Sequence, residues 1–402
     1  SEESFFYPSV GLSSIISEMV KLPSCISYLK VRGSYTEVGS PVSRSGMTPG
    51  TITTPLVGGS LKSTDIYPFT DYKAERTKSY ELGLTARFWQ KLSFDFTWYK
   101  SNTYNQTFIG ELPESSGYKA VYLQAGNVEN RGIEMSLGYT DNFGGLQWNS
   151  SLVYSKNVNE IKEMVKNYHH PLSPKPINIP EVSKDKGRVL LKVGGSINDI
   201  YARKVLAKDN QGFVNVSPSG GINLETVDPI YLGKTTPDFT MGWNNTFTYK
   251  NFGLSFLING RFGGVVTSST QALLDRFGVS KASADARDAG GVMLPNQGLY
   301  DAKKYYTLVA TGETDLAGYY CYSATNVRLQ ELTLSYKFNP RWFNNVVRDL
   351  TLSFVATNPW MIYCKAPFDP ELTSSTGTYG QGNDYFMQPS LKSYGFSLKF
   401  KF

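Results

Sequence analysis

Residues that could carry out chemistry are few in this chain, and their spacing does not suit catalysis. The only two histidines, His169 and His170, are adjacent, so they cannot reach one centre from different elements as a catalytic triad or a zinc site requires. No phosphate-binding loop or dinucleotide fingerprint occurs. The sequence therefore predicts no enzyme, no metal site and no cofactor.

Cysteines and acidic residues give equally weak signals. Cys25, Cys321 and Cys364 lack C-x-x-C spacing, and an odd number cannot all pair within one chain. Cys321 and Cys364 could meet on surface loops, although free structural thiols are the favoured interpretation. The segment Asp369-Pro370-Glu371 could bind a cation, but a turn is the favoured role.

Aromatic residues in the expected loops are the better candidates for ligand contact, because aromatic rings stack on sugars and also grip peptides. Others of them would anchor the chain at a membrane interface, which is the favoured role for any single one. The candidate substrate-binding residues are Tyr319, Tyr320, Tyr322, Trp360, Tyr379 and Tyr385.

Composition narrows the class of protein. Aromatic residues make up 14% of the 402 residues and charged residues only 18%, below the roughly 25% of an ordinary soluble domain. No run of 18 apolar residues exists and the mean hydropathy is −0.29, which excludes a helical membrane protein. A transmembrane β-barrel fits, because its strands alternate apolar and polar residues. The net charge of +6 comes from scattered Lys and Arg, so nucleic acid is a poor candidate partner.

Alternation with a period of two is the strongest pattern in the sequence. In Leu92 to Trp98 every second residue is large and apolar, and Tyr394 to Phe402 repeats this at the end of the chain. Such runs reach about 9 to 12 residues, the length of a tilted membrane-crossing strand. The eleven expected strands are 7–17, 27–37, 78–89, 92–104, 128–140, 146–158, 238–249, 252–263, 324–338, 347–358 and 392–402.

Short and long connections alternate strictly between these strands, as in outer-membrane barrels with short periplasmic turns and long extracellular loops. This parity predicts a periplasmic carboxyl terminus and large extracellular loops at 159–237 and 264–323. An extended segment at 187–208 belongs to the first loop, and a slip of the apolar register between Leu329 and Leu332 suggests a β-bulge.

Eleven strands cannot stand alone, because an open sheet would expose unpaired backbone groups to lipid. We therefore expect an all-β fold, the antiparallel carboxy-terminal half of a 22-stranded transmembrane barrel over residues 1–402. The opening segment, SEESFFYPSVGLS, has no feature of an export signal. We therefore expect the amino-terminal strands and the plug to lie outside this chain.

Several segments together resemble the barrel of SusC-like, TonB-linked outer-membrane transporters, and the resemblance covers essentially the whole chain in order. They include YPSVGLSSIISE, LKVRGSYTEVGS, ERTKSYELGLTARFW, AGNVENRGIEMSL, NVRLQELTLSYKF and the closing YGFSLKF. The resemblance implies active import of a large nutrient, a glycan or an oligopeptide. It also implies a SusD-like lipoprotein lid outside and an inner-membrane TonB complex that acts through the plug.

The final strand resembles the signal read by the outer-membrane insertion machinery, with Tyr394, Phe396, Leu398, Phe400 and Phe402 in the alternating positions. These side chains could equally face lipid, and both roles can hold together. Two other functions stay open: a surface adhesin, and a passive diffusion barrel, although porin loops are rarely as long as 159–237. The substrate, the oligomeric state and the pairing of Cys321 with Cys364 are left open.

Overall fold

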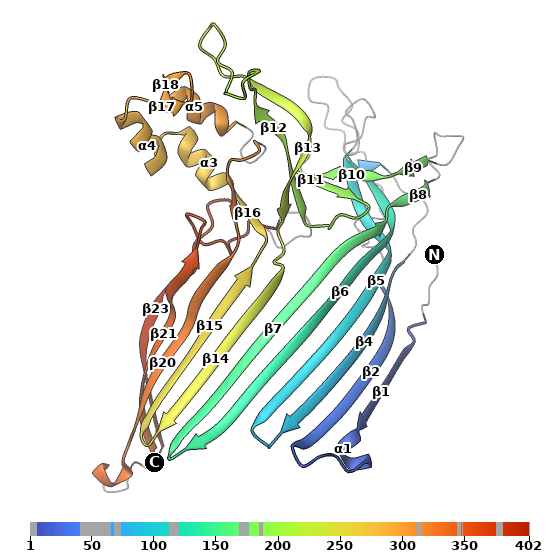
Figure 1. Ribbon diagram of the computed structural model, residues 1–402, viewed down its shortest axis with the longest axis vertical. Coiled ribbons are helices and arrows are strands. Elements are labelled where there is room, and N and C mark those ends of the chain that lie inside the picture. Colours follow the sequence, from blue (N-terminus) through green and yellow to red (C-terminus); the bar gives the residue numbers. More distant parts are fainter. Residues whose placement is uncertain are drawn as a thin grey trace, which may run out of the picture.

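The computed structural model describes residues 6–40, 66–67, 74–111, 120–168, 177–184, 188–311, 316–343, 347, 349–374 and 381–401. Its main feature is one sheet in which eleven long strands follow one another in an antiparallel order (Figure 1). They are β1 (Ser9–Ile15), β2 (Ile26–Ser40), β4 (Glu75–Phe88), β5 (Leu92–Glu111), β6 (Ala120–Phe143), β7 (Leu146–Glu163), β14 (Phe239–Tyr249), β15 (Phe252–Phe262), β20 (Asn326–Phe338), β21 (Asp349–Cys364) and β23 (Ser393–Lys401). A two-residue strand, β3 (Ile66–Tyr67), pairs in parallel with β6.

All eleven expected strands are confirmed, and the differences lie at their ends. The first ends early at Ile15, where the one-turn helix α1 (Ile16–Met19) begins. β6 and β7 instead run further than expected, to Ala120 and Glu163. The apolar alternation fades in their upper parts, but ladder hydrogen bonds need no apolar side chains and continue.

The connections alternate as expected. Tight turns close the hairpins β4–β5, β6–β7 and β14–β15, and the 3-10 helix η3 (Pro340–Phe343) lies between β20 and β21. These turns lie at the same lower end of the sheet as the carboxyl terminus (Figure 1). Gly144 and Gly145, both at positive φ (56° and 96°), make the β6–β7 turn, which suits residues without Cβ. The long connections β7–β14 and β15–β20, as far as the structure describes them, lie at the upper end (Figure 1).

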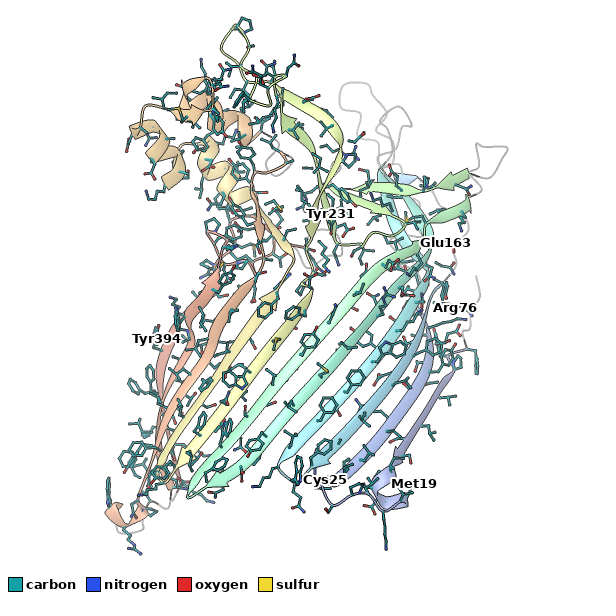
Figure 2. The ribbon with its side chains drawn as sticks, viewed as in Figure 1. Met19, Cys25, Arg76, Glu163, Tyr231 and Tyr394 are labelled. Atoms are coloured by element: carbon teal, nitrogen blue, oxygen red, sulfur yellow. The ribbon has the colours of Figure 1, made fainter. Side chains whose placement is uncertain are left out.

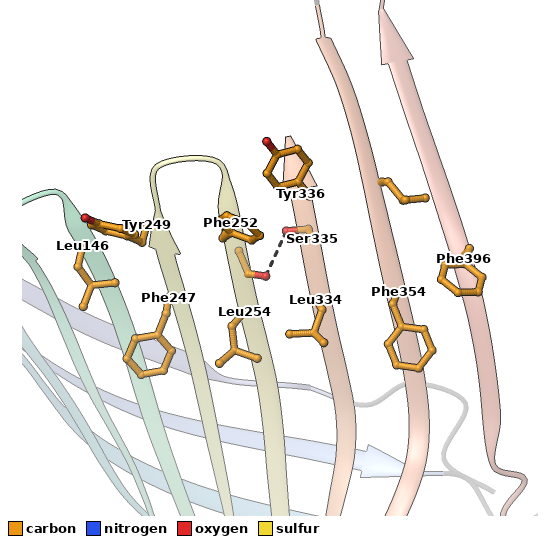
Figure 3. A pocket seen from close by; sticks show the side chains of 12 residues that line it. Leu146, Phe247, Tyr249, Phe252, Leu254, Leu334, Ser335, Tyr336, Phe354 and Phe396 are labelled. Atoms are coloured by element: carbon orange, nitrogen blue, oxygen red, sulfur yellow. Dashed lines mark hydrogen bonds between the residues drawn. The ribbon is translucent and has the colours of Figure 1, made fainter. Parts of the chain in front are cut away.

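The two faces of the sheet differ in polarity. One face, here called the apolar face, carries cross-strand rows such as Leu84, Phe96 and Met135, or Leu334, Phe354 and Phe396. Near the lower turns its side chains form a shallow groove of about 440 Å³ between β7 and β23 (Figure 3). This face suits contact with hydrocarbon.

The opposite face, here called the polar face, carries charged and hydroxyl side chains. Both terminal nitrogens of Arg32 donate to the Asp95 carboxylate at 3.1 and 3.2 Å, and Thr85 and Thr97 complete the cluster. An ion pair of this kind is costly against lipid, so the polar face is the one turned to water.

A β-bulge is confirmed in β20. The pairing with β15 shifts between Leu257 and Ile258, and the pairing with β21 shifts between Leu329 and Glu331. The extra residue keeps both Leu329 and Leu332 on the apolar face, which explains the slip in the sequence pattern.

The β7–β14 connection builds a small subdomain above the sheet. A four-stranded sheet consists of β10 (Glu181–Lys184), β11 (Val189–Lys192), β12 (Asp199–Leu206) and β13 (Leu224–Lys234), and a hairpin joins β8 (Val165–Tyr168) to β9 (Ile177–Ile179). The extended prediction for 187–208 is therefore confirmed, with β11 and β12 inside that connection. Val182, Val189 and Leu191 pack on Val128 of β6 and Ile161 of β7, so this subdomain shares its core with the sheet.

The β15–β20 connection builds a second, mostly helical subdomain, which also lies above the upper end of the sheet (Figure 1). It contains α3 (Ser269–Arg276), α4 (Lys281–Asp288), α5 (Ala302–Val309) and the hairpin of β17 (Val292–Leu294) with β18 (Gly298–Tyr300). A three-stranded sheet of β19 (Cys321–Ser323), β16 (Val265–Ser268) and β22 (Asn383–Asp384) links it to the main sheet. Among the described residues, no helix is long and apolar enough to cross a membrane.

Candidate binding site on the polar face

A polar cavity of about 590 Å³ lies on the upper part of the polar face, where β7, β14 and β15 run side by side. The strands position its side chains through register, because Ser155, Thr240 and Arg261 occupy one cross-strand row. Its polar lining includes Ser151, Thr240, Asn244, Asn259, Arg261 and Glu371. A cavity with several convergent polar groups is the usual form of a small-ligand site.

Arg261 is the principal donor in this cavity. A terminal nitrogen of its guanidinium donates to the backbone oxygen of Thr235, which fixes the head group. Its Nε is buried and finds no acceptor in the part of the chain that the structure describes. A buried donor without an acceptor costs free energy, and Arg261 as a lining residue gives the cavity a positive charge for a ligand that carries oxygen atoms.

Glu371 supplies the opposite charge and comes from the connection after β21. A salt bridge fixes this connection to β20: Nη2 of Arg328 lies 2.8 Å from Oδ1 of Asp369 and 3.4 Å from Oε2 of Glu371. Asp369 also accepts the backbone N–H of Glu371 at 3.1 Å, which confirms the turn expected at Asp369-Pro370-Glu371. Ser390 accepts a further hydrogen bond from Arg328.

The Arg328 salt bridge governs the charge of Asp369. Burial raises the pKa of this carboxyl, but the hydrogen bonds from Arg328 and from the Glu371 backbone outweigh burial, and the pKa is held below its usual value. Asp369 therefore stays ionised beside the cavity. Together, the cavity presents one cation and one anion to a polar ligand.

Two of the candidate substrate-binding residues lie in the core of the helical subdomain. Tyr320 is buried, and its hydroxyl donates to Oδ2 of Asp275 at 2.9 Å. Burial and the Asp275 charge raise the pKa of Tyr320. The Tyr319 hydroxyl pairs with that of Tyr305. Packing within the subdomain is the role that these contacts give to both tyrosines.

The other candidates are spread over three places. Tyr322 on β19 is half-buried, with its ring edge-on to Phe368 at 5.4 Å between centroids. Trp360 is 60% exposed and pairs with Leu329 on the apolar face, the position of a membrane-interface anchor. Tyr385 is exposed beside Phe386, after β22. Tyr379 lies outside the described residues, and substrate contact by any of these side chains stays a prediction.

The last strand places its large residues on the apolar face. Tyr394, Phe396, Leu398 and Phe400 are all exposed, and Phe396 is 78% exposed. They pair in turn with Ala356, Phe354, Leu352 and Leu350 of β21. Phe402 lies outside the described residues. These positions suit contact with lipid, and the assembly-signal role stays a prediction.

The remaining candidates for chemistry do not assemble in the described part of the chain. Cys25, Cys321 and Cys364 are all free thiols, as favoured from the sequence. His169 and His170 lie outside the described residues. No group of three or more His, Cys, Asp or Glu side chains suited to a metal ion occurs among the residues that the structure describes.

Comparison with known proteins identifies the fold. Residues 1–358 match the family described as TonB-dependent receptor-like, beta-barrel. The chain belongs to this family. The resemblance to SusC-like transporters is thereby confirmed at the level of the family, which is one of receptors and transporters and not of enzymes, and whose barrels lie in the outer membrane.

Two curated relatives of this TonB-dependent receptor-like chain illustrate its extent. TonB-dependent receptor P3 of Formosa agariphila is 23% identical over 429 residues, which cover 99% of this chain and 42% of that protein. TonB-dependent receptor SusC of Bacteroides thetaiotaomicron is 24% identical over 287 residues, covering 66% of this chain and 26% of SusC. The chain therefore spans less than half the length of these relatives.

A solved structure shares the fold. The RagAB peptide importer in its closed-closed state superposes with a TM-score of 0.70 at 16% identity, over 98% of this chain and 43% of that one. The similarity supports the assignment of the eleven strands to a TonB-dependent receptor barrel.

Sequence reasoning did not find Arg261 or Arg328. Both stand at polar-face positions near the upper ends of strands β15 and β20. The sequence did contain one signal for these arginines. Each is a charged residue at a polar position of the alternating pattern, next to a long connection. For Glu371 the sequence suggested a turn or, less favoured, a cation site, and not a place in this cavity.

Proposed function

We propose that this chain forms the carboxy-terminal part of the barrel of a transporter that imports a large nutrient across the Gram-negative outer membrane with TonB energy. The observation that supports this best is the difference between the two faces of the sheet. One is apolar over the lower part of the strands, and the other is polar, with a cavity that holds both charges. A membrane barrel with a wet interior needs that combination.

The proposal includes an orientation. The tight turns and the carboxyl terminus would be periplasmic, and the two subdomains over 164–238 and 263–325 would be extracellular. Short turns at one end and folded excursions at the other support it, because outer-membrane barrels have this asymmetry.

The remaining barrel strands, the plug and the TonB contact would come from an amino-terminal part of the same protein, and a SusD-like lipoprotein would cap the subdomains. The two edge strands, β1 and β23, support the proposal that further strands close the barrel. Among the described residues, neither has a partner strand on its outer edge. An open edge in lipid leaves backbone groups unsatisfied, at several kcal/mol each.

The substrate would be a glycan or an oligopeptide. Arg261 and Glu371 suit a ligand that both accepts and donates hydrogen bonds, which sugars and peptides do equally. The exposed Tyr385 would add stacking area.

Uptake of labelled glycans and peptides by cells that carry the full-length protein tests the function. Energy-dependent import predicts accumulation that disappears when TonB is removed. Accumulation that persists without TonB would show a passive barrel, and surface binding without accumulation would show an adhesin.

A paired variant tests the site. Arg261→Gln with Glu371→Gln should lower uptake about tenfold or more while the amount of inserted barrel stays constant, since hydrogen bonds to charged groups contribute about 1.5–3 kcal/mol. Lys250→Gln, at the opposite end of β15, is the control. Equal uptake by all three proteins would exclude the cavity from the transport path.

We propose in addition that the last strand acts as the insertion signal. Deletion of Phe402 should lower the yield of inserted full-length protein, as should Phe400→Ser. Thr351→Ser, on the polar face of the neighbouring strand, is the control, and an unchanged yield for both test variants would remove the role.

A further inference from the structure

A cluster of cationic side chains lies on the apolar face directly above its hydrophobic part. We call it the upper cation patch, and it comprises Arg76, Lys78, Lys100, Arg131, Lys156 and Lys162. Register places it there: Lys156 occupies one row with Ile133 and Trp98, and the next row up contains Tyr80, Lys100 and Arg131. The patch begins where the apolar residues end. Arg76 lies at the upper end of β4 (Figure 2).

Three carboxylates lie beneath the cations. Glu129 is bridged by Lys100 at 2.9 Å, Glu160 by Lys162 at 2.7 Å and Glu37 by Arg76 at 3.5 Å. The side chain of Glu129 is only 6% exposed, whereas that of its partner Lys100 is 41% exposed. The acids are thus covered by the sheet and by the cations, and the outer surface of the patch is positive.

The charges do not balance. A fourth carboxylate, Glu163 in the row of Arg76, is paired with Lys166 outside the patch at 2.9 Å. Six cations therefore stand over the remaining three carboxylates, which leaves three positive charges without a carboxylate of their own. Arg131 lies at 3.8 Å from Glu129 and from Glu160, and each acid already has a closer partner. Lys156 is exposed. These excess cations are not explained by ion pairs within the patch.

The height of the patch restricts its partner. From the row of Lys156 and Trp98 to the row of Arg76 and Tyr104 a strand rises about 20 Å, or about 14 Å along the membrane normal at a tilt of 45°. The interfacial layer of a bilayer is about 5–8 Å thick on each side. The patch therefore spans the layer of lipid head groups, and with the proposed orientation this is the outer leaflet.

We propose that the upper cation patch binds the phosphate groups of a phosphorylated glycolipid in the outer leaflet. Ammonium and guanidinium groups pair with phosphate through charge-assisted hydrogen bonds, and the rows of β4–β7 space them over about 14 Å. Tyr80 and Trp98, in the two lowest rows of the patch, would meet the acyl chains and sugars. The site rests on the proposed orientation and not on transport.

Lys78→Gln, Arg131→Gln and Lys156→Gln form the test variant. These substitutions leave each carboxylate its closer cation, so the sheet keeps its short ion pairs. Lys208→Gln, Lys281→Gln and Lys304→Gln, which lie in the upper subdomains, remove the same charge and form the control. Lys78→Arg, Arg131→Lys and Lys156→Arg keep the charge of the patch.

Binding of diphosphorylated lipid A to the purified full-length protein is measured in neutral-lipid nanodiscs, with dephosphorylated lipid A and phosphatidylglycerol as comparison lipids. The test variant should bind about 100-fold more weakly, from about fivefold for each charge removed. The control and the charge-keeping variant should bind as the parent protein does. Dephosphorylated lipid should bind the parent weakly.

Three results would overturn the site: equal binding by parent and test variant, equal loss in the control, and no preference for phosphate over a simple anionic lipid. Loss of lid-protein binding with lipid binding intact would assign the patch to a protein partner and would also overturn it. Because lipid binding is measured without uptake, a failed transport assay leaves this test independent.

Discussion

Replacement of Asp369 by Asn should loosen the connection that carries Glu371 into the cavity. The side chains of Arg328 and Asp369 are only 7% and 8% exposed. Breaking such a buried pair from one side costs about 3–5 kcal/mol, because the remaining charge loses its partner. Glu371 still lies 3.4 Å from Arg328, so we expect about 2–3 kcal/mol.

Hydrogen exchange of the full-length protein measures this loss locally. A change of about 2–3 kcal/mol corresponds to about 30- to 150-fold faster exchange of residues 365–374. Glu371→Gln is the matched control and should change exchange less than fivefold, since that carboxylate is 43% exposed. Exchange within twofold of the parent for Asp369→Asn would refute the anchoring role.

The same bridge gives a pH dependence of known sign. The pKa of Asp369 is lower in the folded protein than in the unfolded chain, so its stabilisation is fully present above the unfolded value of about 3.9. It is lost as the pH falls through the folded pKa. Exchange of residues 365–374 should therefore accelerate below about pH 4, and Asp369→Asn should abolish that step.

Three further outcomes are expected. Tyr320→Phe leaves buried Asp275 without its hydroxyl donor and should cost the helical subdomain about 2 kcal/mol, seen as faster hydrogen exchange in α3 and α5; unchanged exchange would contradict it. Phe396→Arg should destabilise the full-length barrel by about 2–4 kcal/mol, measured by denaturant titration in vesicles. Ser397→Arg, on the opposite face, should destabilise it by much less, and equal losses would count against the assignment of faces. Burial raises the pKa of Cys321 to about 11, so its alkylation should be slow at pH 8 and rise about tenfold per pH unit towards pH 11, whereas fast labelling at pH 8 would show an accessible thiolate.

Strands of the main sheet were predictable because burial in lipid imposes a period of two on each of them. The bulge in β20 was predictable too, since Leu329 and Leu332 cannot share a face without an extra residue. The subdomain strands were only partly visible. β11 and β12 are short, and adjacent residues are buried in both, so their sequences do not alternate. In β11, Val189 and Leu191 pack in the cluster of Val128 and Ile161.

The candidate site was harder to predict. Arg328 and Asp369 are 41 positions apart, and neither local sequence predicts that the two side chains pair. Burial of Tyr319 and Tyr320 was equally hidden, because a tyrosine-rich loop has the same composition whether its rings face a ligand or each other. Pairings between distant segments depend on the fold, which local patterns do not encode.

Val128 and Ile161 tie the four-stranded subdomain to the wall of the barrel, and this has a mechanical consequence. The upper parts of β6 and β7 cannot separate from β11 without exposing their shared hydrophobic cluster to water. The upper parts of β6 and β7 and the four-stranded subdomain should therefore unfold together and move as one rigid body. A force applied to the four-stranded subdomain would therefore be transmitted to the wall. The helical subdomain is coupled to the same unit, because its hydrophobic cluster packs on Leu206 of β12 and Leu224 of β13.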